Sequence, residues 1–230
     1  MFDNIYILIP VYNEEKQIKN VISELSKVFK NIVAVNDGSS DASQEILESL
    51  NVTVLNHAIN LGQGAAVSTG FKYIQNLKNA EAVVTFDADG QHSIEDAQAF
   101  AKEILLCNEE IIFGSRFIEN EENIPFIKKI ALSIVVIFTN KISKINLSDV
   151  HNGLKAIKKD ALKKIDITLD GFGFESEIIH QASKKEITYK EMPTNTIYTS
   201  YSKNKGQKLA NGLIILEDLF KSRGTKWFSR

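Results

Sequence analysis

The chain has 230 residues, of which 43% are hydrophobic and 24% are charged. This balance is that of an ordinary globular protein and excludes a disordered or fibrous one. The formal net charge of -2 gives no overall attraction for a polyanion, so we expect no nucleic-acid partner. Cys107 is the only cysteine, which excludes an intrachain disulfide. Together with an N-terminus that lacks a secretory pattern, this predicts a cytoplasmic protein.

Short runs rich in β-branched residues alternate with helix-period segments along the first half of the chain. This alternation predicts an α/β fold with a mostly parallel central sheet and helices on both faces. The length predicts a single domain over residues 1–230. The expected strands are IYILIPV at 5–11, NIVAVN at 31–36, NVTVLN at 51–56, AEAVVTFDADG at 80–90 and EIIFGSRF at 110–117. After the first strand, apolar residues at spacings of three and four predict a helix that begins near Glu14.

The second half has a less regular pattern. The segments expected there are an apolar helix at 126–143, a short strand near GLKAI, a helix at 174–183, the strand ITYKEMP, a polar mobile loop at 199–207 and a terminal helix from about 207. A long polar loop beside an active site often acts as a lid.

Two carboxylates, Asp87 and Asp89, stand at the end of the fourth expected strand, in FDADGQH. Carboxylates brought together beside apolar residues repel one another unless a cation offsets their charge. On a continuing strand both would point the same way and could bind one Mg²⁺ or Mn²⁺ that bridges two phosphates. Gln91 and His92 could complete the metal ligands. A turn rich in Asp would explain the same motif without a metal.

Two further motifs stand at the same predicted edge of the sheet. In VNDGSSD, Asp37 leaves the second strand, where a carboxylate can accept hydrogen bonds from a nucleotide base or ribose. In NLGQGAA, Gly62 and Gly64 permit close approach of the backbone just before a helix. The latter lacks the lysine of a Walker A loop and follows the wrong strand for a dinucleotide fingerprint.

Five motifs in this order, each at a successive strand end, resemble the family 2 glycosyltransferases of the GT-A fold, and particularly the dolichyl- or polyprenyl-phosphate sugar synthases. They are IPVYNEE, VNDGSSD, NLGQGAA, FDADGQH and IFGSRF. The resemblance covers about residues 5–200. It implies a Rossmann-like domain that transfers a sugar from a UDP- or GDP-sugar, with a divalent metal and inversion at the anomeric carbon. It also implies a nucleotide-sugar-binding half at 1–117 and an acceptor-binding half at 118–230.

Site residues follow from the resemblance by position. The nucleotide-sugar pocket would include Pro10, Tyr12, Glu14, Asp37, Asn60, Gly64 and Asp87, with Asp149 and Asn152 facing the donor sugar. The metal would be held by Asp87, Asp89 and Gln91. One departure is Asn36, where many relatives have a second aspartate; an asparagine still forms hydrogen bonds there but carries no charge.

The resemblance also implies residues that act on the acceptor, besides a catalytic role for Asp89. Relatives use an arginine at the position of Arg116 to bind an acceptor phosphate, although a surface ion pair with Glu119 or Glu121 would explain it too. Glu175 is the candidate base if the acceptor is a hydroxyl, whereas a phosphate needs none. We interpret His151 as a structural histidine.

The apolar helix at 126–143 has several interpretations. Its lysines, Lys128, Lys129, Lys141 and Lys144, lie at both ends with no acidic residue among them. Contact with the inner face of a membrane or with a lipid acceptor would explain this pattern, as would a subunit interface in a homo-oligomer or burial in the core.

The acceptor could be a lipid phosphate or a cell-surface glycan precursor. Two other classes of protein are alternatives. A nucleotidyltransferase should carry a glycine-rich basic loop after the first strand, but IPVYNEEKQ has no glycine. A catalytically silent binding module would be expected to have lost one metal carboxylate, but both are present.

Overall fold

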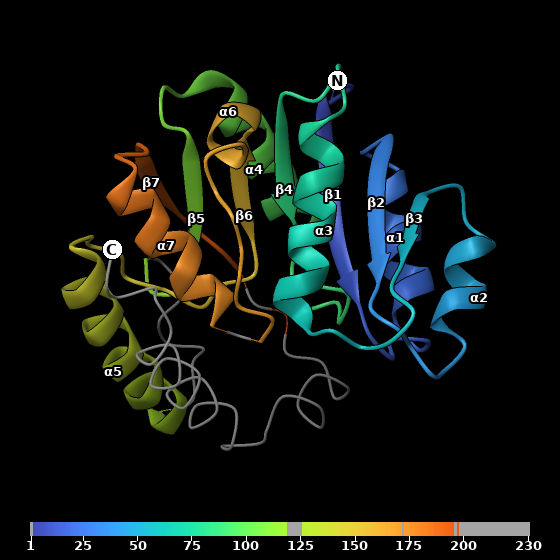
Figure 1. Cartoon of the computed structure of the whole chain (residues 1–230), viewed down its shortest axis with the longest axis horizontal. Helices are drawn as coiled ribbons and strands as arrows, with labels where there is room; N and C mark the ends of the chain where they lie inside the picture. The colour runs from blue at the N-terminus through green and yellow to red at the C-terminus, as the bar shows by residue number, and fades with distance from the viewer. Residues whose placement is uncertain (1, 119–125, 172, 196, 198–230) are drawn as a thin grey trace.

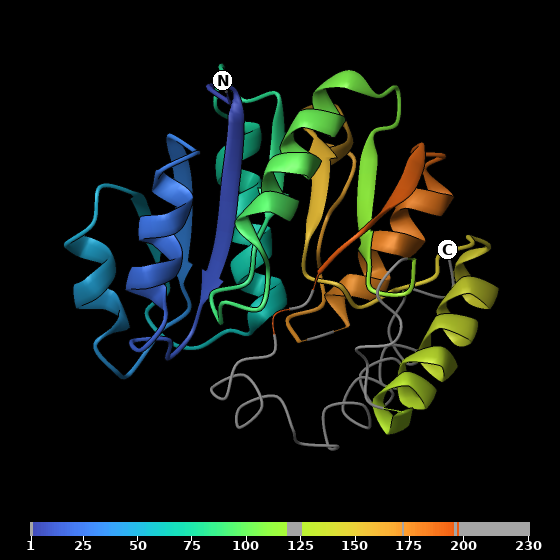
Figure 2. The same cartoon turned by 180° about the vertical axis from the view of Figure 1, so that it is seen from behind.

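A seven-stranded sheet forms the centre of the computed structural model, with helices on both of its faces (Figures 1 and 2). The structure describes residues 2–118, 126–171, 173–195 and 197. The strands are β1 (Ile5–Val11), β2 (Asn31–Asn36), β3 (Thr53–Asn56), β4 (Ala82–Thr85), β5 (Ile111–Ser115), β6 (Lys155–Lys158) and β7 (Tyr189–Pro193).

The strand order is β3-β2-β1-β4-β6-β5-β7. All neighbouring strands are parallel except β6, which runs antiparallel to both β4 and β5. The predicted α/β fold with a mostly parallel sheet is confirmed. Because β6 comes from the second half of the chain, both halves contribute to one sheet.

The helices divide between the two faces of the sheet. They are α1 (Ile18–Ser26), α2 (Ser43–Glu48), α3 (Gln63–Gln75), α4 (Ile94–Leu106), α5 (Phe126–Ser143), α6 (Lys159–Leu162) and α7 (Phe174–Lys184). Residues of α3, α5 and α7 belong to one apolar cluster, and residues of α1 and α4 belong to the other. Figures 1 and 2 show these two sets on opposite sides of the sheet.

Strand β1 shows how the sequence builds both layers. Leu8 faces the cluster that contains α3, while Ile7 and Ile9 face the cluster that contains α1 and α4, because successive side chains of a strand point to opposite faces. A Cβ at Gly70 would lie 2.2 Å from a methyl carbon of Leu8, so this glycine lets α3 approach the sheet closely.

Two predicted boundaries are wrong. The first helix, expected near Glu14, begins at Ile18, because residues 14–17 form a turn in which the Glu14 carbonyl accepts from the amides of Gln17 and Ile18. The fourth strand, expected through the carboxylates, ends at Thr85, the last residue of β4 paired with β1 and with β6. The carboxylates therefore lie in the loop that leads to α4, and the argument from strand alternation does not apply to them.

The helix predicted at 126–143 is α5, and it packs against α7. No helix within the described ranges is long and apolar enough to cross a membrane. The predicted loop at 199–207 and the terminal helix from 207 lie outside the described residues.

Candidate active site

The candidate site lies where the parallel strands end, at the lower edge of the sheet in Figure 1. Asp37 follows β2, the loop with Asp87 and Asp89 follows β4, and Arg116 follows β5. Parallel strands bring these ends to one edge, where α/β proteins bind ligands. The motifs that the sequence singled out therefore lie at one edge of the sheet, as the predicted topology requires.

The loop after β4 holds its two carboxylates in different ways. Asp87 receives a hydrogen bond from His92 Nε2 at 2.9 Å, and Gln63 Nε2 lies 3.5 Å from its other oxygen. Asp89 accepts from both the backbone and the side chain of Gln91, at 2.9 and 2.6 Å. Asp89 and Gln91 are thus bonded to each other, while Asp87 contacts His92 of the same loop and Gln63 of α3.

The two carboxylates also differ electrostatically. Burial and the negative charge of Asp87 raise the pKa of Asp89 above its usual range. Burial opposes ionisation of Asp87 too, but the His92 hydrogen bond and the charges of Lys155 and Arg116 hold the pKa of Asp87 below its usual range. A hard divalent cation would relieve the repulsion that Asp89 experiences.

Within the ranges that the structure describes, no three His, Cys, Asp or Glu side chains form a ready-made metal site. The carboxylates Asp87 and Asp89 still suit a hard cation, since oxygen is the ligand that Mg²⁺ prefers. Magnesium commonly takes one or two carboxylates from the protein and its remaining ligands from water and phosphate. The two residues therefore fit such an ion only as part of a larger set of ligands.

A pocket beside this loop is lined by residues from both halves of the chain. They are Pro10, Gln63, Val67, Thr85, Asp87, Gly153, Lys155, Phe174, Glu175 and Ile178. Pro10, Asp87 and Glu175 were predicted site residues, whereas Gln63 and Lys155 were missed. Gln63 stands inside the NLGQGAA motif, and Lys155 is a charged residue in an apolar strand, which is the signal that could have found it.

Lys155 and Glu175 form a buried ion pair in this pocket, with side chains 3% and 8% exposed. The Lys155 ammonium also donates to the carbonyl of Asn152. Burial raises the pKa of Glu175 above its usual range, although the charge of Lys155 opposes the rise. Glu175 lies where a base could act, but its carboxylate is already in contact with an ammonium.

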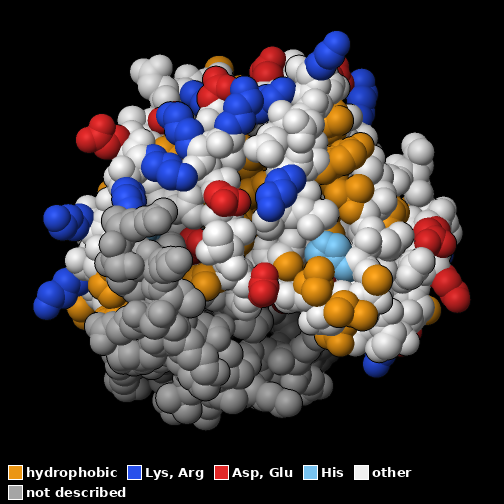
Figure 3. Space-filling model, viewed as in Figure 1, with side chains coloured by type: hydrophobic (Ala, Val, Ile, Leu, Met, Phe, Trp, Pro, Cys, Tyr) orange, Lys and Arg blue, Asp and Glu red, His pale blue; other side chains and the backbone are white. Residues whose placement is uncertain are grey.

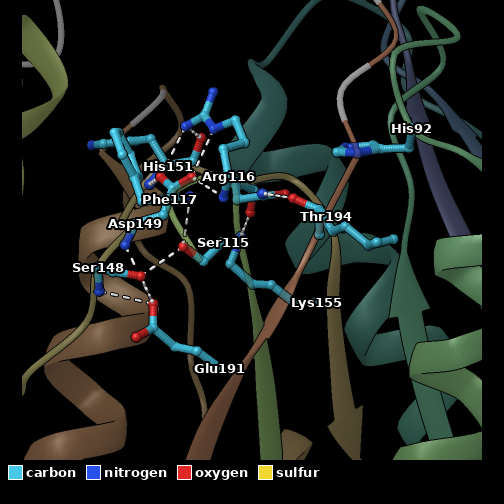
Figure 4. A network of polar contacts seen from close by, with 12 residues as sticks. His92, Ser115, Arg116, Phe117, Ser148, Asp149, His151, Lys155, Glu191 and Thr194 are labelled. Carbon is cyan, nitrogen blue, oxygen red and sulfur yellow. Dashed lines mark hydrogen bonds and ion pairs between the residues drawn. The ribbon is translucent and has the colours of Figure 1, made fainter. Parts of the chain in front are cut away.

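Arg116 forms an ion pair with Asp149 (Figure 4). Its Nε and Nη2 donate to the two carboxylate oxygens at 2.6 and 2.8 Å, and Nη2 also donates to the His151 carbonyl at 2.8 Å. Burial opposes ionisation of Asp149, but the charge and hydrogen bonds of Arg116 hold the pKa of Asp149 below its usual range. The alternative partners Glu119 and Glu121 lie outside the described residues.

A second set of contacts fixes the loop that carries Asp149 (Figure 4). The amide and hydroxyl of Ser148 both donate to Glu191 of β7 at 2.8 Å, and the Ser148 hydroxyl lies 2.6 Å from that of Ser115 at the end of β5. Asn152, predicted to face the donor sugar, is buried and donates to the Thr194 hydroxyl at 2.7 Å. These bonds join residues 148–152 to two strands.

The residues predicted around the nucleotide lie near the ends of β1, β2 and β3. Glu14 is buried, and its amide donates to the Ser43 hydroxyl at 2.8 Å, whereas Tyr12 is 45% exposed. Asn60 is exposed, and its side chain donates to the Asp37 carbonyl at 3.3 Å. Gly64 is buried at the start of α3, and its amide donates to the Asp170 carbonyl at 2.8 Å.

The segment that follows β7 lies along the acidic loop. The Asn195 amide donates to Asp96 at 2.6 Å, and the Ile197 amide donates to the Gln91 carbonyl at 2.9 Å. Exposed Lys and Arg side chains gather elsewhere, over the upper part of the face in Figure 3, near α6. Lys155 lines the pocket, and the positive charges of Lys155 and Arg116 both act on Asp87.

An open α/β sheet with carboxylates after two of its parallel strands, β2 and β4, is the arrangement in which many enzymes of the nucleotide-binding class hold their ligands. The sequence model of Glycosyl transferase family 2 matches residues 6–166. This chain belongs to glycosyltransferase family 2, and the resemblance seen in its motifs is confirmed.

Two relatives from archaea span nearly the whole chain. An uncharacterized protein, MJ1222 of Methanocaldococcus jannaschii, is 36% identical and covers 93% of this chain and 90% of its own length. The UDP-N-acetylglucosamine–dolichyl-phosphate N-acetylglucosaminyltransferase of Methanococcus voltae is 34% identical, and the match covers 92% of each chain. The chain is thus a glycosyltransferase whose relatives include dolichyl-phosphate sugar transferases.

Solved structures agree in fold. Glucosyl-3-phosphoglycerate synthase from Mycobacterium tuberculosis, in complex with phosphoglyceric acid, has a TM-score of 0.71 at 13% identity, over 96% of this chain and 80% of that one. Its complex with Mg²⁺ and UDP has a TM-score of 0.70 at 14% identity, with the same coverage. This likeness shows the GT-A fold.

Proposed function

We propose that this glycosyltransferase transfers a sugar from a UDP- or GDP-sugar to a polyprenyl phosphate, with a divalent metal and with inversion at the anomeric carbon. The observation that carries the proposal is the acidic loop after β4, which places Asp87 in the wall of a pocket that Lys155 and Glu175 close. In such a pocket a nucleotide sugar would meet the metal ligand Asp87, the cation of Lys155 and the carboxylate of Glu175.

Of the two nucleotides, the uridine form has the stronger support. The name of the Methanococcus voltae relative specifies a UDP-sugar, and the Mycobacterium tuberculosis synthase binds UDP. Tyr12, at the end of β1, has the exposure to contact a base. A guanosine donor is the alternative that the binding experiment below distinguishes.

For the metal, we propose Asp87 and Asp89 as ligands of Mg²⁺ or Mn²⁺, with Gln91 as a third through its amide oxygen. The Gln91 amide nitrogen already donates to Asp89, so its oxygen would complete a set of oxygen ligands. The bound ion would neutralise charge on the departing nucleotide diphosphate. Lys155 would keep Asp87 ionised, because its positive charge lowers the pKa of that carboxyl.

For the acceptor, we propose that Asp149 orients Arg116 toward a lipid phosphate. Its bidentate grip leaves the guanidinium plane with one orientation, and Arg116 remains 13% exposed. An ionised phosphate oxygen would attack the anomeric carbon from the side opposite the nucleotide. The new C–O bond would form as the bond to the diphosphate breaks, which inverts the configuration. No base is needed, which suits a Glu175 already paired with Lys155.

A glycan hydroxyl is the second candidate acceptor, and it would require a base. The raised pKa of Glu175 favours this alternative, since a carboxylate with a raised pKa is a better proton acceptor. The two acceptors make opposite demands on Glu175: a Glu175→Gln variant should retain transfer to a phosphate and lose transfer to a hydroxyl.

A polyprenyl acceptor would also require contact with a membrane surface, and we propose α5 for it. Ile137 of α5 is 67% exposed, and Lys141 and Lys144 are exposed at its end. Exposed apolar and basic groups on one helix suit a surface of anionic lipid.

The binding half of the proposal is tested by titration of UDP and GDP into the protein with Mn²⁺ and with EDTA. We expect UDP to bind more tightly than GDP, and both to bind more tightly with Mn²⁺. Asp89→Asn should weaken nucleotide binding only when Mn²⁺ is present, whereas the matched Glu95→Gln, at an exposed site on α4, should bind like the wild type. Binding of neither nucleotide, or equal binding with EDTA, would overturn the proposal.

A further inference from the structure

The carboxylate of Asp37, predicted as a nucleotide ligand, is held by three donors of the protein itself. One oxygen receives the Leu61 amide at 2.9 Å and lies 2.7 Å from His57 Nδ1, and the other receives the Gly62 amide at 2.8 Å. The Asp37 side chain is only 3% exposed. These contacts occupy most of the oxygen lone pairs that could bind a ligand.

His57 connects this carboxylate to α3. Its Nδ1 lies 2.7 Å from an Asp37 oxygen, and its Nε2 lies 2.9 Å from the Thr69 hydroxyl on α3. With the proton on Nδ1, the ring donates to the Asp37 carboxylate and accepts from the Thr69 hydroxyl. The His57 side chain is 9% exposed, so water competes little for either bond.

The segment held by Asp37 is also fixed from the other side. Gly62 has φ +101°, and a Cβ there would lie 2.3 Å from the Asp170 carbonyl oxygen. The Gly64 amide donates to the same carbonyl at 2.8 Å. The backbone amides of 61, 62 and 64 are therefore bonded to protein oxygens, and they are not arranged as a phosphate loop.

Between these fixed amides stands Gln63, which lines the pocket and whose Nε2 lies 3.5 Å from Asp87. A continuous set of contacts thus leads from Thr69 through His57 and Asp37 to the residue that contacts the proposed metal ligand. A shift of the backbone at Gly62 would move Gln63 within the pocket.

We propose that His57 is a positioning residue that, through Asp37, fixes the entrance of α3 and so sets the affinity for the donor nucleotide and its metal. This inference rests on the proposed function. Loss of the His57 donor would leave a buried carboxylate with fewer hydrogen bonds, and the 61–64 segment would be free to move to replace the missing contact.

Two substitutions separate the bonds of His57. His57→Asn keeps a donor near the place of Nδ1 and gives up the contact with Thr69. His57→Gln reaches toward Thr69 and gives up the donor to Asp37. A pair of variants at Thr69 tests the hydroxyl alone. Thr69→Val removes it, and the matched control Thr69→Ser keeps it.

The variants are tested by titration of UDP with Mn²⁺ into the full chain, and by KM and kcat for the UDP-sugar. We expect His57→Gln to raise the Kd for UDP and the KM about tenfold with kcat changed less than threefold, and His57→Asn to stay within about threefold of the wild type. Thr69→Val should show a smaller loss than His57→Gln, and Thr69→Ser should show none. Amide exchange at Gly62 should quicken in His57→Gln.

Equal Kd values in all variants would overturn the inference, as would equal losses in His57→Asn and His57→Gln, since these would indicate a general structural role. If either histidine variant fails to fold, Thr69→Val with a wild-type Kd and unchanged Gly62 exchange would overturn it. A wild-type protein that binds neither UDP nor GDP would instead refute the proposed function, and the inference with it.

Discussion

Asp149 is buried and forms a bidentate ion pair with the partly exposed Arg116, so a change at Asp149 tests how the guanidinium is positioned. Asp149→Asn keeps the size of the side chain but removes the charge that two guanidinium bonds share. We expect the KM for polyprenyl phosphate to rise about tenfold, since a bond to a charged group contributes about 1.5–3 kcal/mol. Donor affinity should not change. Steady-state kinetics with each substrate varied in turn would measure both, and a rise in donor KM alone would contradict this role.

Lys155 and Glu175 form an ion pair whose two side chains are almost completely buried. Lys155→Met leaves the Glu175 carboxylate buried without its counter-ion, and we expect the free energy of unfolding to fall by about 3–5 kcal/mol. The double variant with Glu175→Met should recover most of this loss, because no uncompensated charge remains. Urea denaturation of the two single variants and the double variant measures the coupling. Additive losses would mean that the ion pair contributes nothing.

His151 should make the free energy of unfolding depend on pH. Burial lowers its pKa from 6.5 to about 4, and its Nε2 has no hydrogen-bond partner among the described residues. Between about pH 4 and pH 6.5, the unfolded chain therefore binds a proton at His151 that the folded chain does not. Its contribution to stability is complete above about pH 6.5 and is lost as the pH falls toward 4.

At pH 5 the loss should amount to about 2 kcal/mol relative to pH 7. His151→Gln removes the titrating group, so its free energy of unfolding should fall less between pH 7 and pH 5 than that of the wild type. Denaturant unfolding at the two pH values measures the difference. Parallel losses in both proteins would show that His151 does not titrate in this range.

At the scale of the elements, the sequence predicted strands better than the loops between them. β1 and β2 have the predicted bounds, because a continuous apolar run followed by Asn or a turn residue marks a buried parallel strand. The end of β4 could not be predicted in this way. It is decided by the pairing of Thr85 with Leu8 and Lys155, and the latter lies in the second half of the chain.

The same limit explains which site residues were missed. Asp37, Asp87 and Arg116 belong to motifs at strand ends, so their common edge followed from the predicted topology. The charge of Lys155 in an apolar strand was a local signal, but its place in the pocket depends on the long-range pairing of β6 between β4 and β5, which the local sequence does not predict. The position of Gln63 could not be predicted either, because it depends on the bond between the Gly62 amide and Asp37, two residues far apart in the sequence.

The start of α3 should be the element most sensitive to small changes. A Cβ at Gly64 would lie 2.0 Å from the Leu169 carbonyl oxygen, which is backbone and cannot swing aside. We expect Gly64→Ala to destabilise the protein by about 1–3 kcal/mol and to weaken UDP binding. The control on the same helix is Gly70→Ala, where the nearest atom is a Leu8 methyl carbon of a side chain that faces the core and not the pocket. Thermal unfolding with and without UDP compares them, and equal binding losses would contradict a role for the close approach at Gly64.

At the scale of the whole molecule, the predicted division at residue 117 does not separate two parts of the fold. β6, β7 and α7 follow that point, yet the two strands complete the same sheet and α7 supplies Glu175 to the pocket. The predicted donor-binding and acceptor-binding halves therefore share one sheet. We expect a fragment of residues 1–117 to fold poorly, because β4 would lose its antiparallel partner and β5 would lose both of its neighbours. Circular dichroism of the fragment would test this, and a cooperative unfolding transition would contradict it.

The activity proposed for this chain is a metal-dependent transfer of sugar to a lipid phosphate. A transfer assay tests it: the protein is incubated with labelled UDP- or GDP-sugars, polyprenyl phosphate and Mn²⁺, and the label in the lipid product is measured. We expect lipid-linked sugar from at least one UDP-sugar, loss of product with EDTA, and a loss of at least about a hundredfold in Asp89→Asn. Label that remains with the nucleotide for every donor, or transfer that is unaffected by EDTA, would contradict the account.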